Sequence, residues 1–189
     1  MLYIVECSYN DPESEQAWND FYSLEKLPAL LSVAGFSSSQ RFRALSAGCP
    51  VYLAIHTVKD AEVLVGDDYR HKGGGHFSHG QANITDWHRN LYEYAGTTPA
   101  VSPDEILAIT PRPVKLIQAL PERHVLELKA AGLDKYPARR FAYVIPRENA
   151  PLLAAESGVC LYEALTPQCS AARHENRACL LNAPRGLYE

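Results

Sequence analysis

The first half of the sequence places strand-like and helix-like segments in one order, and this order limits the possible folds more than any other feature. Alternating or β-favouring apolar patterns cover residues 2–9, 36–45, 51–58 and 82–94, and helical patterns cover 12–34 and 60–69. The order is βαββαβ, in which two helices cover one face of a four-stranded antiparallel sheet. The other face needs a second sheet, from another chain or from the same one.

Local signals set the limits of these segments. Asp11 and Pro12 suit the first positions of a helix, Pro28 predicts a kink within it, and Gly35 predicts its end. Lys72 is followed by three glycines, which cannot hold a regular element without a large entropic cost, so a loop is expected there.

The second half has a weaker pattern. Residues 1–96 are expected to form one unit, residues 96–99 read as a linker, and 101–189 are expected to form a second unit that is a degenerate copy of the first. Strands are predicted at 105–110, 140–145, 159–165 and 177–181, and helices at 122–131 and 149–156. No clear repeat of residues supports the copy, so it rests on the order of elements.

Composition excludes several classes of function. The net charge is -4 and no run of basic residues is longer than two, so a nucleic-acid partner is not expected. No apolar stretch approaches the length of a membrane span, and the first residues lack the pattern of a signal peptide. A cytoplasmic protein without a membrane partner is the resulting prediction.

The five cysteines are dispersed and include no CxxC pair. This argues against a disulfide framework and against a thiolate zinc site, so reduced and mostly buried thiols are expected. Nucleotide-binding and serine-hydrolase motifs are absent from the sequence, and we expect no cofactor and no metal.

Several segments together resemble the EthD-like branch of the dimeric α+β barrel superfamily. They are residues 18–31 (WNDFYSLEKLPALL), 33–36, 41–43, 52–55 and 62–64. The resemblance covers roughly the first half and implies an α+β fold in which a ferredoxin-like unit forms an α+β barrel around an apolar cavity. The barrel would be closed within the chain or in a homodimer.

The sequence departs from the pattern of this family at one position. Relatives often have Glu-His-Leu-Pro in the first helix, with the histidine near the cavity, whereas here Glu25 is followed by Lys26. A catalytic histidine therefore does not transfer to this position. The superfamily includes cofactor-free isomerases, cyclases, lyases and monooxygenases as well as haem-binding branches, and the fold does not choose among them.

Histidines concentrate around the expected third and fourth strands, and histidine moves protons near neutral pH. The catalytic candidates are His56 and His88, each weighed against a hydrogen-bonded histidine of the sheet. Asp86 is a partner for His88 because residues two apart on a strand share a face, and Tyr22 is a hydrogen-bond donor to a substrate carbonyl.

Other candidates would contact a small-molecule substrate rather than react with it. They are Trp18, Arg41, Tyr69, His71, His76 and His79. The last three histidines flank the glycines of a loop that reads as solvated or as a lid, and their spacing matches no established metal-ligand pattern.

These features give three hypotheses. The leading one is a cofactor-independent lyase, isomerase or cyclase that acts by proton transfer on a small aromatic, lactone or polyketide-like molecule. The second is a non-catalytic protein that holds a hydrophobic ligand in the same barrel. The third is a haem or metal oxidoreductase.

Overall fold

A computed structural model describes residues 1–74, 79–96, 98–120 and 124–171. The elements of the first half are β1 (Leu2–Tyr9), α1 (Glu15–Phe21), the π-helical turn η1 (Tyr22–Lys26), α2 (Leu27–Leu31), β2 (Phe36–Ala44), β3 (Tyr52–Val58), the 3-10 turn η2 (Ala61–Leu64), α3 (Asp67–His71), the 3-10 turn η3 (Gln81–Asn83) and β4 (Ile84–Glu93).

The second half is made mainly of strands. Its elements are β5 (Glu105–Thr110), α4 (Lys115–Gln118), β6 (His124–Leu133), β7 (Arg139–Pro146), the 3-10 turn η4 (Arg147–Asn149), α5 (Ala150–Leu153), β8 (Cys160–Ala164) and β9 (Cys169–Ser170).

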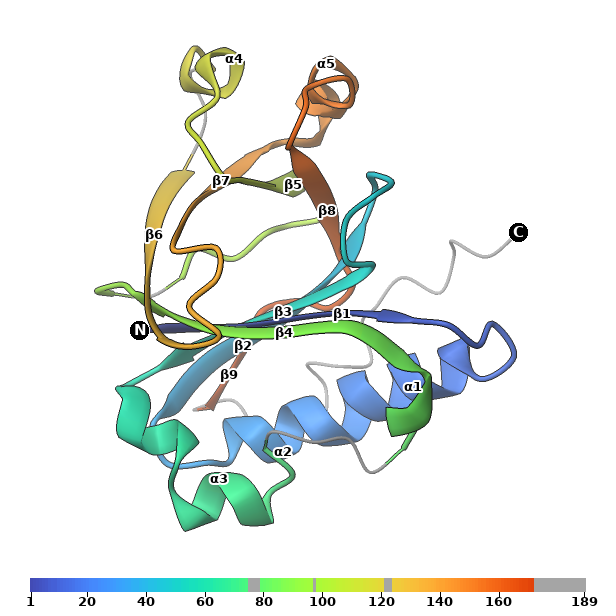
Figure 1. The fold of residues 1–189 in the computed structure, drawn as a ribbon, viewed down its shortest axis with the longest axis vertical. Coiled ribbons are helices and arrows are strands. Elements are labelled where there is room, and N and C mark those ends of the chain that lie inside the picture. The colour runs from blue at the N-terminus through green and yellow to red at the C-terminus, as the bar shows by residue number, and fades with distance from the viewer. Residues whose placement is uncertain (75–78, 97, 121–123, 172–189) are drawn as a thin grey trace.

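Strands β1 to β8 close into an antiparallel barrel (Figure 1). The first half pairs its strands in the order β2-β3-β1-β4 and the second half in the order β6-β7-β5-β8. The halves join where β4 pairs with β6 and where β2 pairs with β8, and β9 extends the same edge of β2. The sheet that covers the open face of β1–β4 therefore comes from the same chain.

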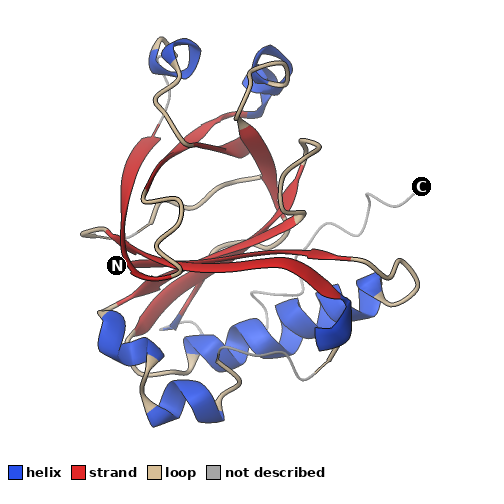
Figure 2. Ribbon diagram, viewed as in Figure 1, coloured by secondary structure: helices blue, strands red, loops and turns tan. Residues whose placement is uncertain are grey.

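The helices lie outside this barrel on two sides (Figure 2). Helices α1, α2 and α3 cover the outer face of β1–β4, while the short α4 and α5 lie at the opposite end of the molecule, over the second half. One hydrophobic core lies between the first helices and the sheet, a second fills the barrel, and a third lies beneath α4 and α5. The molecule is an α+β barrel with a helical layer on its N-terminal sheet.

The barrel interior is packed with side chains. Its walls include Leu2, Phe42, Leu107, Leu128 and Val144, and the space left between them is about 10 Å³, about enough for one water. Among the described residues, this space is too small for the open apolar cavity that the family resemblance implies.

The long first helix contains the expected disturbance at Pro28. Within η1 the N–H of Leu27 bonds the carbonyl of Tyr22, five residues back. Proline has no N–H and its ring collides with the carbonyl four residues before it in an α-helix, and the wider π turn removes that conflict. The helix continues through Leu31, and residue 35 follows at a positive φ of 100° that suits glycine.

The expected helix at 122–131 is wrong, because residues 124–133 form β6 between β4 and β7. The short α4 was not expected. The predicted strand at 177–181 lies outside the described residues.

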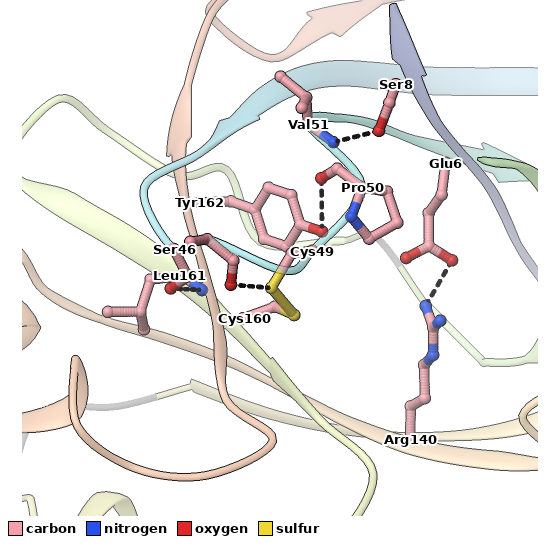
Figure 3. The surroundings of a disulfide bond; sticks show 11 residues. Glu6, Ser8, Ser46, Cys49, Pro50, Val51, Arg140, Cys160, Leu161 and Tyr162 are labelled. Carbon is pink, nitrogen blue, oxygen red and sulfur yellow. Dashed lines mark hydrogen bonds and ion pairs between the residues drawn. A yellow bond between two sulfur atoms is a disulfide. The ribbon is translucent and has the colours of Figure 1, made fainter. Parts of the chain in front are cut away.

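The expectation of reduced thiols is wrong for two cysteines, because Cys49 and Cys160 form a disulfide (Figure 3). They are 111 positions apart in sequence, and barrel closure brings the loop between β2 and β3 against the start of β8. Spacing in the sequence could not reveal this pair. Cys7 and Cys169 are free and buried, and Cys179 lies outside the described residues.

Within the part of the chain that the structure describes, no helix has both the length and the apolar character to span a bilayer.

Candidate functional site

The last residue of the π turn, Lys26, is buried although its side chain carries an amine. It is only 8% exposed, and its Nζ donates a hydrogen bond to the carbonyl oxygen of Gly73 at 2.6 Å. Burial lowers the pKa of Lys26 to about 8. A measurable fraction of this amine is therefore neutral near physiological pH, which suits it to accept a proton or to attack a carbon.

His56 lies on β3 beneath the same helical layer and is fully buried. Its Nδ1 is 2.7 Å from the hydroxyl of Ser39, and its ring stacks on Tyr3 with centroids 5.4 Å apart. Burial, and then the positive charges of Lys26 and Arg41, lower the pKa of His56 to about 3. The imidazole is thus neutral, and Lys26 is close enough for its charge to act on it.

The other ring nitrogen of His56 is an atom of this site that a ligand could bond. Nε2 is buried and has no hydrogen-bond partner among the described residues. A buried polar atom without a partner costs free energy, commonly about 1 to 3 kcal/mol, so it needs an explanation. A ligand atom that bonds this nitrogen would supply one.

Aromatic rings surround the imidazole of His56, and Gly74 packs on one of these rings. The hydroxyls of Tyr3 and Tyr69 are 2.9 Å apart, and Phe36 places its ring edge against His56 at 5.6 Å between centroids. Gly74 lies flat on the Tyr69 ring, where an added Cβ would come within 2.4 Å of ring atoms. A residue with a Cβ would therefore not fit between the backbone at position 74 and this ring.

Arg41 lies under α1 and fills its own aromatic cage. Its guanidinium donates to the carbonyl and side-chain oxygens of Asn19 and to the hydroxyl of Ser23. The guanidinium carbon is 4.1 Å from the centre of the Tyr22 ring and 5.4 Å from that of Trp18. Arg41 is 1% exposed, so it stabilises the helical layer from within, and Trp18 and Tyr22 belong to the same cage.

His88 and Asp86 lie away from this site. Both are exposed, and no hydrogen bond or ion pair joins them among the described residues. Asp86 has a φ of 51°, and the pairing of β4 with β1 shifts register at this point. The regular alternation that would place both side chains on one face is interrupted here.

The histidines of the loop region are also separate from His56. His71 is exposed at the end of α3, and His79 is exposed with its ring 4.6 Å from that of Phe21. His76 lies outside the described residues. Across the described ranges, no group of three histidine, cysteine or acidic side chains is placed to hold a metal.

An open groove runs beside α1 and η1, with a volume of about 620 Å³. Its walls are formed in part by Tyr9, Trp18, Asp20, Phe21, Glu25 and His79. Two of the expected ligand-contacting residues, Trp18 and His79, thus line the same groove, and Lys26 is not among its lining residues.

A polar group also lies within the barrel, near the disulfide (Figure 3). Arg140 donates to the buried carboxylate of Glu6 at 2.7 Å, and Tyr162 donates to the carbonyl of Pro50 at 3.1 Å. These contacts tie strands of the first half to strands of the second. Glu6, Arg140 and Tyr162 each have a partner here, whereas the buried hydroxyl of Tyr92, close enough for the charges of Arg140 and Glu6 to act on it, has none among the described residues.

Of the expected catalytic residues, the structure places His56 in an enclosed polar site and leaves His88 outside it. Lys26, Tyr3 and Ser39 were missed. A signal for Lys26 was present in the sequence, because Lys26 stands where the proteins that the first half resembles often carry a histidine, and its side chain is buried and hydrogen-bonded to Gly73.

No protein-family model and no curated protein matches this chain. Among solved structures, the chain is similar to one described as "Crystal structure study of anthrone oxidase-like protein". The TM-score is 0.54 and the identity 12%, over 90% of this chain and 93% of the other. At this identity the similarity shows a shared overall fold, and the EthD-like branch stays a prediction.

Proposed function

We propose that this protein processes a small organic molecule by proton transfer, at the site formed by Lys26, His56 and Tyr69 between the helical layer and the N-terminal sheet. The observation that carries the proposal is a buried amine whose charge lowers the pKa of a buried imidazole, and this imidazole has an Nε2 without a partner in the described residues. Perturbed titratable groups of this kind concentrate at functional sites.

The two groups take different roles. His56 is too weak a base to remove a proton near neutral pH, so it acts as a neutral hydrogen-bonding group toward a substrate oxygen. Lys26, with a pKa of about 8, accepts the proton and returns it at a second position. This is a revision of the expectation that a histidine is the base.

The surrounding rings indicate the substrate class. Phe36, Tyr3 and Tyr69 offer aromatic faces and edges, which favour a small aromatic, lactone or polyketide-like molecule. The description of the similar structure as anthrone oxidase-like agrees with a barrel that processes small molecules. The reaction is that of a lyase, isomerase or cyclase, and a proton transfer of this kind requires no cofactor.

The two halves are proposed to be degenerate copies of one ferredoxin-like unit, residues 1–96 and 101–189. The shared strand order, β2-β3-β1-β4 and β6-β7-β5-β8, supports this proposal. In the described part of the chain, the first copy has the larger helical layer, and the proposed site lies beneath it.

Exchange of carbon-bound hydrogen with deuterated water tests the proton transfer. A panel of small aromatic ketones and lactones is incubated with the protein, and deuterium uptake is followed by NMR. The rate should fall by a factor on the order of 10² in Lys26→Met and in His56→Gln. His88→Gln is the matched control and should exchange at the wild-type rate.

Exchange that persists in the double variant Lys26→Met/His56→Gln would contradict this function. Ligands that bind at the site without exchange would instead support the alternative, a non-catalytic protein that holds a hydrophobic molecule.

A further inference from the structure

The groove beside α1 and η1 has room for a small molecule. Its volume of about 620 Å³ lies within the roughly 300 to 1,000 Å³ that is usual for ligand sites. Part of its wall is a stripe of the helix, with Ala17, Phe21 and Leu24 at steps of four and three residues. None of the three residues of the proposed proton-transfer site lines it, so a ligand in the groove would bind at a separate place.

Two stacked aromatic rings form another part of the wall. The rings of Tyr9 and Trp18 are stacked with centroids 4.9 Å apart, and the hydroxyls of Tyr9 and Ser14 are 2.9 Å apart. Gly80 packs against both rings, because an added Cβ would come within 2.6 Å of the Tyr9 hydroxyl and 3.0 Å of Trp18. These contacts fix the rings before a ligand arrives, so little conformational entropy is lost when it binds.

Apolar surface is also available in the groove. Leu24 is 52% exposed although its side chain is apolar. Phe21 is partly exposed, and its ring lies 4.6 Å from that of His79. The hydrocarbon part of a ligand therefore has side chains to cover, and covering them would remove apolar area from water.

The charged side chains of the groove are acidic. Asp20 and Glu25 line it and are exposed, and neither forms an ion pair with any described residue, although Gln16 donates a hydrogen bond to Asp20 at 2.8 Å. Residues 11–25 contain five acidic side chains and no basic one. The potential along this segment therefore attracts cations and repels anions.

Aromatic rings and carboxylates together suit an ammonium group. The negative face of a ring attracts a cation, and a carboxylate accepts its N–H bonds. We propose that this groove is a second binding site, which takes a small organic ammonium compound. The cation lies toward Asp20 and Glu25, and the hydrocarbon part covers Phe21 and Leu24. The site binds this compound without making or breaking a covalent bond.

Three probes of nearly equal shape test the proposal on the intact protein labelled with nitrogen-15. They are phenethylamine, which is a cation at pH 7, the neutral 2-phenylethanol, and the anion 3-phenylpropionate. Phenethylamine should bind on the order of tenfold more tightly than the alcohol, and the anion should bind more weakly than either. The amide signals of Ala17, Leu24 and Gly80 should shift as phenethylamine is added.

Two variants separate the groove from the general negative charge of the segment. Asp20→Asn/Glu25→Gln changes only exposed side chains, so the fold is retained, and its affinity for phenethylamine should fall on the order of tenfold, to that for the alcohol. Glu13→Gln is the matched control, because Glu13 is exposed in the same segment and does not line the groove. Its affinity should stay within about twofold of the wild type.

Three results would overturn the proposal. They are the absence of phenethylamine binding, equal affinities for phenethylamine and 2-phenylethanol, and an equal loss of affinity in Glu13→Gln and the double variant. Deuterium exchange at the proton-transfer site is measured separately, so either proposal can fail while the other stands.

Discussion

Burial disfavours the charged forms of both His56 and Lys26. The burial of His56 makes the free energy of unfolding depend on pH. The pKa of His56 is about 3 in the folded protein and about 6.5 in an unfolded chain. Between these values the unfolded state binds more protons, so the free energy of unfolding must fall as the pH falls from about 6.5 toward 3.

We predict that chemical denaturation from pH 7 to pH 4 will show this loss in the wild-type protein and a smaller loss in His56→Gln. Carboxylates contribute equally to both proteins, so the difference between the two curves isolates the histidine. Parallel curves would mean that His56 is solvated or already paired.

At the scale of single residues, the sequence indicated that histidines are candidates for the site, but not which side chains surround each histidine. Strand alternation gave His56 and His88 equal chances of facing inward, because the register of β3 and β4 depends on their pairing with β1. The bulge at Asp86 then altered one of these strands in a way that no local pattern indicated.

Lys26 is the last residue of the π turn η1, and Arg41 on β2 hydrogen-bonds the helix around this turn. The guanidinium bonds Asn19 just before the turn and Ser23 within it, so the planar fork matches oxygens from two places in the helix. A lysine amine cannot reproduce this geometry.

Arg41→Lys should therefore lower the free energy of unfolding by about 2 to 4 kcal/mol, because it removes hydrogen bonds to partly buried oxygens of Asn19 and Ser23 and the packing of the guanidinium on the rings of Trp18 and Tyr22. Arg43→Lys, two residues along the same strand and less buried, should cost under about 1 kcal/mol. Urea denaturation compares the two. Equal costs would remove Arg41 from its role as an anchor.

The helix and strands of the first half were predictable because propensity, turn residues and periodicity agree there. The segment that became β6 is the opposite case. Leu, Glu, Lys and Ala favour a helix locally, yet Leu126 and Leu128 alternate with the exposed Glu127 and Lys129. Pairing with β4 and β7 provided the burial that overrode the local preference.

At the scale of the whole molecule, two junctions close the barrel, and one of them carries the Cys49–Cys160 disulfide. The pairing of β2 with β8 involves three residues on each strand, supported by Leu45 and Ser46, which hydrogen-bond the backbone of Leu161. A covalent link across 111 positions restricts the unfolded chain strongly.

The double variant Cys49→Ser/Cys160→Ser should lose about 3 to 5 kcal/mol of unfolding free energy relative to the oxidised protein. Reductant should lower the wild type to the level of this variant and leave the variant unchanged. If reductant has no effect on the wild type, the disulfide is absent in solution. The disulfide also favours an oxidising environment, so a cytoplasmic location stays only a prediction.

Closure within one chain also affects the predicted partners. Residues 105–164 cover the face of the N-terminal sheet that a second copy would otherwise need to cover. A homodimer stays a prediction, but the barrel does not require it. Because the interior is filled, chemistry is expected beneath the helices, a location that depends on tertiary packing and was not evident from the sequence.

The pH dependence of deuterium exchange into a ligand tests the central claim most directly, that Lys26 and His56 form the working site. The claim predicts a rate that rises with pH through about 8, as the Lys26 amine becomes neutral, and that loses this rise in Lys26→Met. A profile that is the same in Lys26→Met as in the wild type would contradict it and would place the chemistry elsewhere in the molecule.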